Sequence, residues 1–227
     1  MNNIRNNIKE SITVYESERA PRDKPTITPG LEIGKFDDYT DSIILRECMY
    51  TGDESIIYNS MMNYRWSFDE IDGQVDNLIA SVDDEKVKDA NKIDYARYWN
   101  GYLVYMKPLL LFFNVSEIRI INMILQLLLV CIVIIGLEKR LGFRYALSFG
   151  ATVAFMNPVA LSASIQFYDV YYLMLFQMII VIYCEKYLDK NKRKEKLLLV
   201  SGILVAFFDF LTYPIVAFGF LIILLAL

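Results

Sequence analysis

The chain has 227 residues, of which 55% are of apolar types, and its formal net charge is −4. It contains no histidine and three cysteines. These counts exclude His-based metal sites and Ser-His-Asp or Cys-His catalytic groups, and they argue against a disulfide-stabilised fold. Any catalysis therefore depends on carboxylates, Tyr, Lys, Arg or a metal held by carboxylates.

The charges divide the chain into two halves of different character. Residues 1–117 hold 13 basic and 21 acidic residues, a net charge of −8, whereas residues 118–227 hold 10 basic and 6 acidic residues, a net charge of +4. This division is typical of a water-exposed acidic segment followed by a membrane segment. The acidic half also argues against a nucleic-acid partner. We therefore expect an all-α integral membrane protein whose residues 1–117 are extracytoplasmic.

Several short helices are expected in the acidic half. Ile4, Ile8 and Ile12 recur every four residues, as they do on one face of an amphipathic helix. After a loop rich in Pro and Gly at residues 20–34, the apolar run from Ile43 to Met49 predicts a second helix, capped by Thr40 or Asp41.

A third helix is expected after Ser67 and Glu70, whose spacing fits a capping box. Its apolar face would hold Ile71, Val75, Leu78, Ile79 and Val82.

Residues 93–113 interleave aromatic side chains with Arg97 and Lys107. A helix of this composition is typical of the membrane interface, where Tyr and Trp gather. One interpretation is a simple aromatic anchor. The alternative is that Arg97, Trp99 and Asn100 bind the phosphate or the sugar of a lipid-linked molecule.

The second half reads as a series of membrane spans, each of about 20 apolar residues. Residues 120–137 are uncharged, and so are residues 145–168, in which Pro158 is expected to kink the helix. Together these stretches predict four to five transmembrane helices, at about 118–137, 145–166, 168–188, 197–212 and 214–227.

Basic residues mark one side of the predicted bundle. They follow the first span at residues 138–144 and the third span at residues 186–196. By the positive-inside bias these loops are cytoplasmic, which places residues 1–117 outside a bacterial cytoplasmic membrane. The N-terminus has no apolar stretch that would act as a signal peptide. Together with the apolar run that continues to Leu227, this leads us to expect a fragment of a longer membrane protein.

Carboxylates and other polar groups at the ends of spans are the candidate site residues, because such groups are costly near lipid. On the expected outer side these are Asp37, Asp38, Asp41, Gln166, Asp169, Asp209 and Tyr213. One carboxylate could be a general base, or two could hold Mg²⁺ or Mn²⁺ against a phosphate that Arg97 or Lys107 also contacts. Simpler roles stay open, with Asp41 as a helix cap, Asp37 and Asp38 in a turn, and Asp169 among the headgroups.

Five short motifs carry a resemblance to a known family. They are Phe36–Asp41, Tyr95–Tyr102, Lys107–Leu110, Gln166-Phe167 and Phe210–Pro214. Over most of residues 30–227 the chain resembles bacterial GT-C-type membrane glycosyltransferases of surface-polysaccharide assembly. The resemblance implies an acidic catalytic or metal-binding residue in the first external loop, here Asp37, Asp38 or Asp41, with Asp38 and Asp41 favoured.

The resemblance implies transfer of a sugar from a polyprenyl-phosphate carrier to a cell-envelope glycan. In that function Arg97 would contact the phosphate, and Trp99, Asn100, Gln166, Asp169, Asp209 and Tyr213 would bind substrate. Two alternatives stay open. The chain could be a non-catalytic flippase or scaffold component that binds the same lipid-linked glycan, or an inactive truncated remnant.

Overall fold

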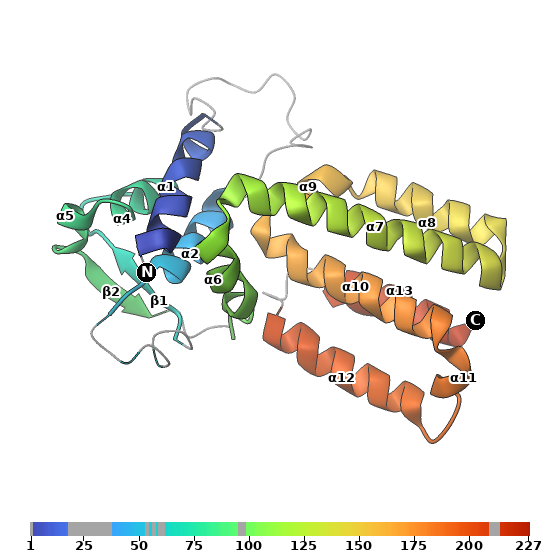
Figure 1. Cartoon of the computed structure of the whole chain (residues 1–227). Coiled ribbons are helices and arrows are strands. Elements are labelled where there is room, and N and C mark those ends of the chain that lie inside the picture. Colours follow the sequence, from blue (N-terminus) through green and yellow to red (C-terminus); the bar gives the residue numbers. More distant parts are fainter. Residues whose placement is uncertain are drawn as a thin grey trace. The chain divides into compact units, whose positions relative to one another are not determined.

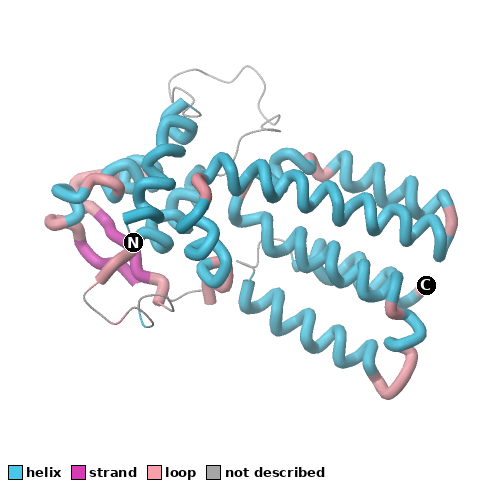
Figure 2. The backbone as a smooth tube through the Cα atoms, viewed as in Figure 1, coloured by secondary structure: helices cyan, strands magenta, loops and turns pink. Residues whose placement is uncertain are grey.

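The computed structural model describes residues 2–17, 38–52, 55, 58, 62–94, 99–208 and 214–227. Most of these residues are helical (Figures 1 and 2). The chain forms two compact units. The first unit comprises residues 1–98 and 102–119, and the second comprises residues 99–101 and 120–227. Each unit is described by itself below.

The first two helices of the first unit match their apolar patterns. Helix α1 (Asn2–Ser17) buries Ile4, Ile8 and Ile12, which confirms the expected apolar face. Helix α2 (Asp38–Met49) is buried at every position from Asp41 to Met49. A helix buried on all sides lies in the interior of its unit, and α2 is the central helix of this one. The helix begins at Asp38, so the expectation that Thr40 or Asp41 caps it is wrong.

A two-stranded sheet corrects the expectation that the chain is entirely helical. Strand β1 (Tyr64–Ser67) pairs antiparallel with β2 (Asn91–Asp94), with Tyr64 opposite Asp94 and Ser67 opposite Asn91. Figure 2 shows the two strands side by side.

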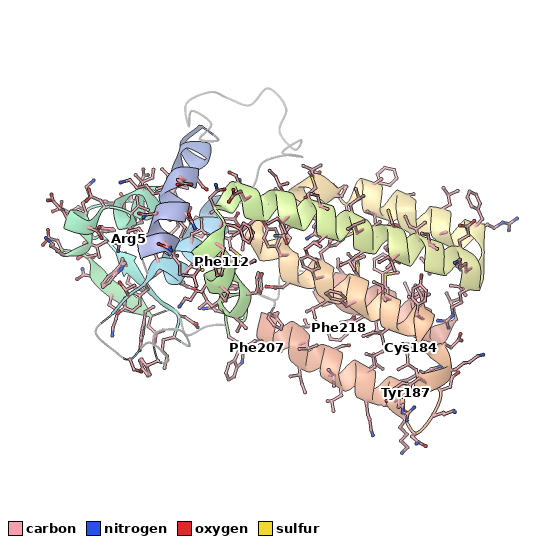
Figure 3. All side chains as sticks on the ribbon, viewed as in Figure 1. Arg5, Phe112, Cys184, Tyr187, Phe207 and Phe218 are labelled. Atoms are coloured by element: carbon pink, nitrogen blue, oxygen red, sulfur yellow. The ribbon has the colours of Figure 1, made fainter. Side chains whose placement is uncertain are left out.

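Helices α4 (Gln74–Ser81) and α5 (Asp84–Val87) lie between the strands in sequence. Ser67 ends a strand and Gly73 is the N-cap of α4, so the expected capping box does not form. Arg5 of α1 forms an ion pair with Asp84 at the start of α5 (Figure 3).

The last part of the first unit leads into a long apolar helix. Helix α6 (Leu103–Phe112) covers the second half of the range in which an interfacial helix was expected, while Ile93 and Asp94 belong to β2. Helix α7 (Val115–Leu141) follows after a short break. The division between units at Arg119 falls close to the change in composition after residue 117.

The second unit is a bundle of helices whose long members lie side by side (Figure 1). The helices of this unit that follow α7 are α8 (Phe143–Phe155), α9 (Pro158–Ala163), α10 (Ile165–Tyr183), α11 (Glu185–Leu188), α12 (Arg193–Phe208) and α13 (Pro214–Ala226). Each predicted span thus contains helix. Asn157 has a left-handed backbone (φ 54°), and its side chain accepts a hydrogen bond from the amide of Ala160. Residues 145–166 are therefore two helices, and Pro158 starts the second one instead of kinking a single one.

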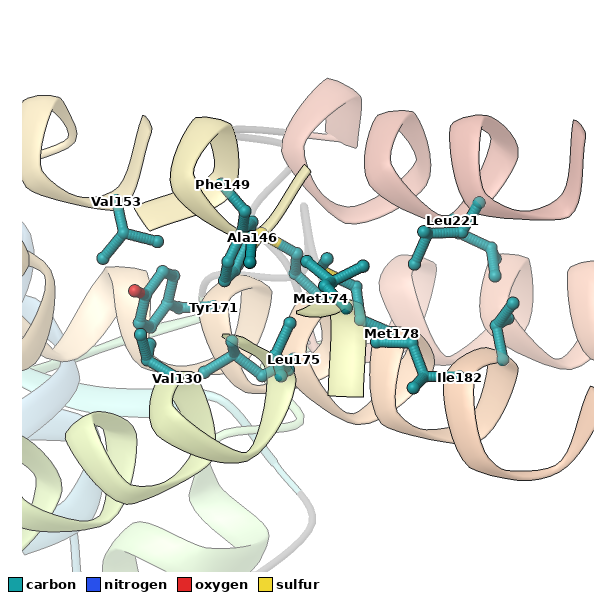
Figure 4. Packing of buried hydrophobic residues seen from close by; sticks show 14 of the residues in the cluster. Val130, Ala146, Phe149, Val153, Tyr171, Met174, Leu175, Met178, Ile182 and Leu221 are labelled. Carbon is teal, nitrogen blue, oxygen red and sulfur yellow. The ribbon is translucent and has the colours of Figure 1, made fainter. Parts of the chain in front are cut away.

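The core of the second unit is an apolar cluster shared by α7, α8, α10 and α13. Val130, Phe149, Met174, Leu175 and Leu221 are among its buried members (Figure 4). Helices α7 and α10 are both long and apolar enough to cross a membrane, which weakly indicates membrane association. Helices α6 and α13 are apolar but shorter.

Candidate functional site

Asp41, one of the two favoured carboxylates, lies in the first turn of α2 with none of its surface exposed. Its Oδ2 is 3.4 Å from Nη2 of Arg119, at the start of α7, and the Arg119 side chain is only 11% exposed. A carboxylate covered in this way cannot meet a substrate hydroxyl without a rearrangement. In the structure Asp41 pairs with a nearly buried arginine and so links α2 to α7.

The most densely charged interior of the first unit surrounds Glu47, which sequence reasoning missed. Glu47 is fully buried on α2. Its Oε1 accepts a hydrogen bond of 3.2 Å from Nη1 of Arg65 on β1, and its Oε2 accepts a hydrogen bond from the hydroxyl of Tyr102. Next to it on α2, Arg46 donates to the carbonyl of Trp66 at 3.0 Å and to the side chain of Gln74.

Burial controls the ionisation of this cluster, which we call the Glu47 cluster and define as Arg46, Glu47, Arg65 and Tyr102. Burial raises the pKa of Glu47 to about 7, although the Tyr102 hydroxyl and Arg65 act in the opposite direction. Burial and the nearby Arg65 lower the pKa of Arg46 to about 10. Burial, with the Glu47 carboxylate beside it, also raises the pKa of Tyr102.

Two further titratable groups lie beside the Glu47 cluster. Burial raises the pKa of the Cys48 thiol to about 12, so the thiol is not a nucleophile at neutral pH. Burial lowers the pKa of Lys107 on α6, while Cys48 and Glu47 act in the opposite direction. The interior of the first unit therefore holds a carboxyl group, that of Glu47, with a pKa near neutrality.

The Trp99–Gly101 segment belongs to the second unit and contacts the end of α12. The amide of Gly101 donates to the carbonyl of Phe207 at 3.1 Å, and the Trp99 ring lies 6.4 Å from the Phe207 ring. Trp99 is 74% exposed, as a membrane anchor or a stacking side chain would be. Asn100 is buried and has a left-handed backbone (φ 50°), and neither polar atom of its side-chain amide has a hydrogen-bond partner among the residues that the structure describes.

Gln166 and Asp169 both lie at the N-terminal end of α10 and are buried. Both have interaction partners. They are one turn apart and share this end of the helix, as expected from their positions in the sequence. Asp169 is therefore packed inside the second unit. A carboxylate that simply lay among the lipid headgroups would be exposed instead.

The remaining candidates lie outside the described residues or show no side chain. Asp37, Arg97, Asp209 and Tyr213 are outside the described ranges. Asp38 is the first residue of α2, but its side chain is not among those that the structure describes. Among the described residues no three Asp, Glu or Cys side chains come together as metal ligands. The structure thus brings Gln166 close to Asp169, and Trp99 close to Asn100, but it leaves Asp41 in a different unit from these four.

One sequence signal does point to the Glu47 cluster. Arg46 and Glu47 interrupt a helix that is otherwise apolar from Ile43 to Met49. Adjacent opposite charges in the middle of such a helix indicate buried, paired groups rather than a solvated face. Comparison with known protein families, with curated proteins and with solved structures found no match to this chain.

Proposed function

We propose that the chain is an integral membrane protein in which the second unit lies in the bilayer. The observation that carries this proposal is the inverted distribution of side chains on α7. Many of its large apolar residues face outward, with Ile124, Leu127 and Leu128 at least half exposed, whereas its Asn122 and Gln126 are buried among apolar residues of the same face. A helix of a water-soluble protein has the opposite arrangement, since its apolar face covers the core. Polar residues that face the bundle interior are typical of membrane helices.

The same arrangement extends over the rest of the second unit. Large apolar side chains that are at least half exposed also occur on α8, α9, α12 and α13, at Leu147, Phe155, Val159, Leu199, Val200, Ile203, Ile215, Ile222 and Ile223. We propose four to five spans, at the positions expected from the sequence, with α8 and α9 together making the second. Exposed apolar side chains on so many helices are stable in lipid and would favour aggregation in water.

The orientation we propose has the basic segments in the bacterial cytoplasm and the first unit outside. In the structure Arg140 near the end of α7 forms an ion pair of 2.8 Å with Glu185 and donates to the carbonyl of Val181 at 2.7 Å. The two basic segments therefore lie at the same end of the second unit, which is the arrangement that the positive-inside bias requires.

Cysteine labelling in intact cells tests this orientation. Native Cys48 is buried and Cys131 and Cys184 are exposed, so all three are first replaced. Single cysteines are then introduced at exposed Glu85 in the first unit and at exposed Lys190 in the second. A membrane-impermeant reagent is expected to label Glu85→Cys and to spare Lys190→Cys until the cells are opened. The reverse pattern would contradict the proposed orientation.

Within that orientation we propose glycosyl transfer from a polyprenyl-phosphate-linked sugar to a cell-envelope glycan. The resemblance of the short motifs to GT-C-type glycosyltransferases supports this activity. Because Asp41 is enclosed by its ion pair with Arg119, we assign the general base to Asp38, which lies at the very start of α2. If Mg²⁺ or Mn²⁺ takes part, Asp38 and Asp37 would be its carboxylate ligands. Asp41 is less suited to bind the metal ion, because its carboxylate is buried in the ion pair with Arg119.

A comparison of two Asp→Asn variants tests the activity. The purified protein in detergent is given polyprenyl-phosphate-linked hexoses together with a cell-envelope glycan as the acceptor, and release of polyprenyl phosphate is measured. Asp38→Asn is expected to lower the rate about 10²–10⁴-fold while the melting temperature and lipid binding are unchanged. Asp41→Asn is expected to lower the melting temperature. Full activity of Asp38→Asn would contradict its assignment as the base.

A second candidate function is a non-catalytic component that binds the same lipid-linked glycan. It is favoured by the burial of Asp41 and Glu47, since both carboxylates of α2 whose side chains the structure describes are engaged inside the unit. The same assay separates the two functions. A carrier or scaffold component binds the lipid-linked sugar but releases no polyprenyl phosphate in the wild type.

A further inference from the structure

Among the polar side chains buried inside the second unit, two on α7 form a layer that meets α10. Asn122 and Gln126 lie one turn apart on the buried face of α7, which continues with Val130, Val133 and Leu137. The buried face of α7 is therefore polar in the half nearer its N-terminus and apolar in the half nearer its C-terminus. Two apolar helices buried against each other in lipid have no need of such groups unless the groups have partners.

The register between α7 and α10 places a third polar group in the same layer. The hydroxyl of Tyr172 donates to Oδ1 of Asn122 at 2.8 Å, which fixes Asn122 beside this part of α10. Tyr171 belongs to the same apolar cluster as Val130 and lies next to it in Figure 4. Gln126 lies between Asn122 and Val130 on the same buried face of α7, one turn from each.

Within the described part of the chain, four polar atoms in this layer have no hydrogen-bond partner. They are Nδ2 of Asn122, both polar atoms of the Gln126 side chain, and the hydroxyl oxygen of Tyr171. Each of the three side chains is more than nine-tenths buried. A buried polar group without a partner is costly, and native proteins satisfy such groups with protein or with ordered water.

We propose that Asn122, Gln126 and Tyr171 line an internal pocket that binds water within the apolar unit, a site separate from the proposed glycosyl-transfer function. Water fits because the amide of Gln126 and the hydroxyl of Tyr171 both donate and accept, whereas Nδ2 of Asn122 donates. All three side chains are neutral, so they give no counter-charge to an ion.

The sign of a change in melting temperature tests whether the pocket is occupied. In a hydrated pocket Gln126→Leu displaces the water and leaves Asn122 and Tyr171 unpaired, so the melting temperature of the protein in detergent falls. In a dry pocket the same substitution removes two unpaired atoms and the melting temperature rises, which would overturn the proposal. Met178→Leu, a change of similar volume in the same core, gives the shift expected from repacking alone.

Exchange of a thiol proton with heavy water provides the second measurement. In protein that lacks the three native cysteines, single cysteines replace Gln126 and, as the control, Val133, which is completely buried on the same face of α7. The infrared S–H band of Gln126→Cys in D₂O is expected to convert to S–D many times faster than that of Val133→Cys. Equal rates at the two positions would overturn the proposal, even if Gln126→Leu unfolds and gives no melting curve.

Discussion

Single residues decide where charge is tolerated in the first unit. Glu47 has no exposed surface, yet it sits beside two arginines and accepts a hydrogen bond from Tyr102. Its neighbours favour the carboxylate, but burial outweighs them and favours the neutral acid. The result is a carboxyl group that changes charge near neutral pH inside a folded unit, which makes the stability of that unit sensitive to pH.

We expect the free energy of unfolding of the first unit to fall as the pH rises from about 4.5 to about 7. The pKa of Glu47 is raised from 4.5 to about 7 in the folded state, so the folded chain binds more protons than the unfolded chain throughout this window. Linkage then makes the loss as large as about 3 kcal/mol, at about 1.4 kcal/mol for each pH unit. Urea titrations at pH 5 and pH 8 measure it.

The control for this prediction is Glu47→Gln, which cannot ionise but keeps an oxygen that can accept from Arg65 or Tyr102. The variant is expected to lose most of the difference between pH 5 and pH 8. A variant whose unfolding free energy changes with pH as steeply as that of the wild type would show that another group is responsible.

The ion pair between Asp41 and Arg119 gives a second prediction for single residues. Its Nη2–Oδ2 distance is 3.4 Å and both side chains are nearly enclosed, so salt screens it little. We expect Arg119→Gln to lower the free energy of unfolding by about 1–3 kcal/mol, because the buried carboxylate loses a counter-charge. A double-mutant cycle with Asp41→Asn measures the coupling, and additive effects would refute the pairing.

Whole elements were predictable where a periodic pattern acts alone. The isoleucines of α1 are every four residues and all three are buried, and the uncharged run at residues 120–137 is the middle of α7. The two-stranded sheet was not predictable, because each strand has only four residues and two helices lie between the strands in sequence. Strand β1 is half-buried throughout and β2 exposed throughout, so neither shows the alternation of a one-sided sheet.

The candidate site was less predictable than the elements, since it depends on contacts between distant segments. Asp41 meets Arg119 across 78 positions, and Tyr102 meets Glu47 across 55. A carboxylate near a helix start looks the same in the sequence whether it caps the helix, pairs with arginine or acts as a base. The residue that pairs with the carboxylate decides the chemistry of the carboxylate, and a local sequence pattern does not identify that residue.

The contact between the Trp99–Gly101 segment and α12 depends on a glycine. A Cβ atom at Gly101 would lie 2.6 Å from the carbonyl oxygen of Phe207 and 2.7 Å from its ring. We expect Gly101→Ala to push the segment off α12 and to lower the melting temperature by several degrees, as overpacking by about 1–3 kcal/mol does. The fluorescence of Trp99, in a Trp66→Phe background, should change with it.

Gly202→Ala is the matched control, because it lies on α12 itself. A Cβ atom there would be 3.8 Å from the nearest heavy atom, the Cζ of Phe218, which is ordinary contact. It should leave Trp99 fluorescence unchanged, and as a helical Gly→Ala change it should stabilise slightly. If Gly101→Ala behaves in the same way, the contact between the segment and α12 does not hold in solution.

The whole molecule combines a unit with a charged interior and a unit with an apolar exterior. In the first unit, Asp41, Arg46 and Glu47 are buried. In the second, polar Asn122 and Gln126 are inside and leucines such as Leu127 are outside. Each unit therefore buries some polar side chains within an apolar core, but only the second also exposes large apolar side chains over most of its helices. That combination is understandable if lipid, not water, is the solvent of the second unit.

The strongest test of this interpretation is a charge placed on the outer face of α7. Leu127 is 63% exposed and lies near the middle of the apolar stretch at residues 120–137. If this face contacts lipid, Leu127→Lys costs about 2.5–3.5 kcal/mol of insertion free energy, and a smaller share of the protein resists extraction from membranes by alkaline carbonate. Phe143→Lys, at the exposed start of α8 beside Arg144, should have little effect because its charge reaches the headgroups. If the face contacts water instead, Leu127→Lys replaces an exposed apolar side chain with a soluble one. The variant would then be at least as stable as the wild type and would appear in the soluble fraction, and the membrane placement of the second unit would be wrong.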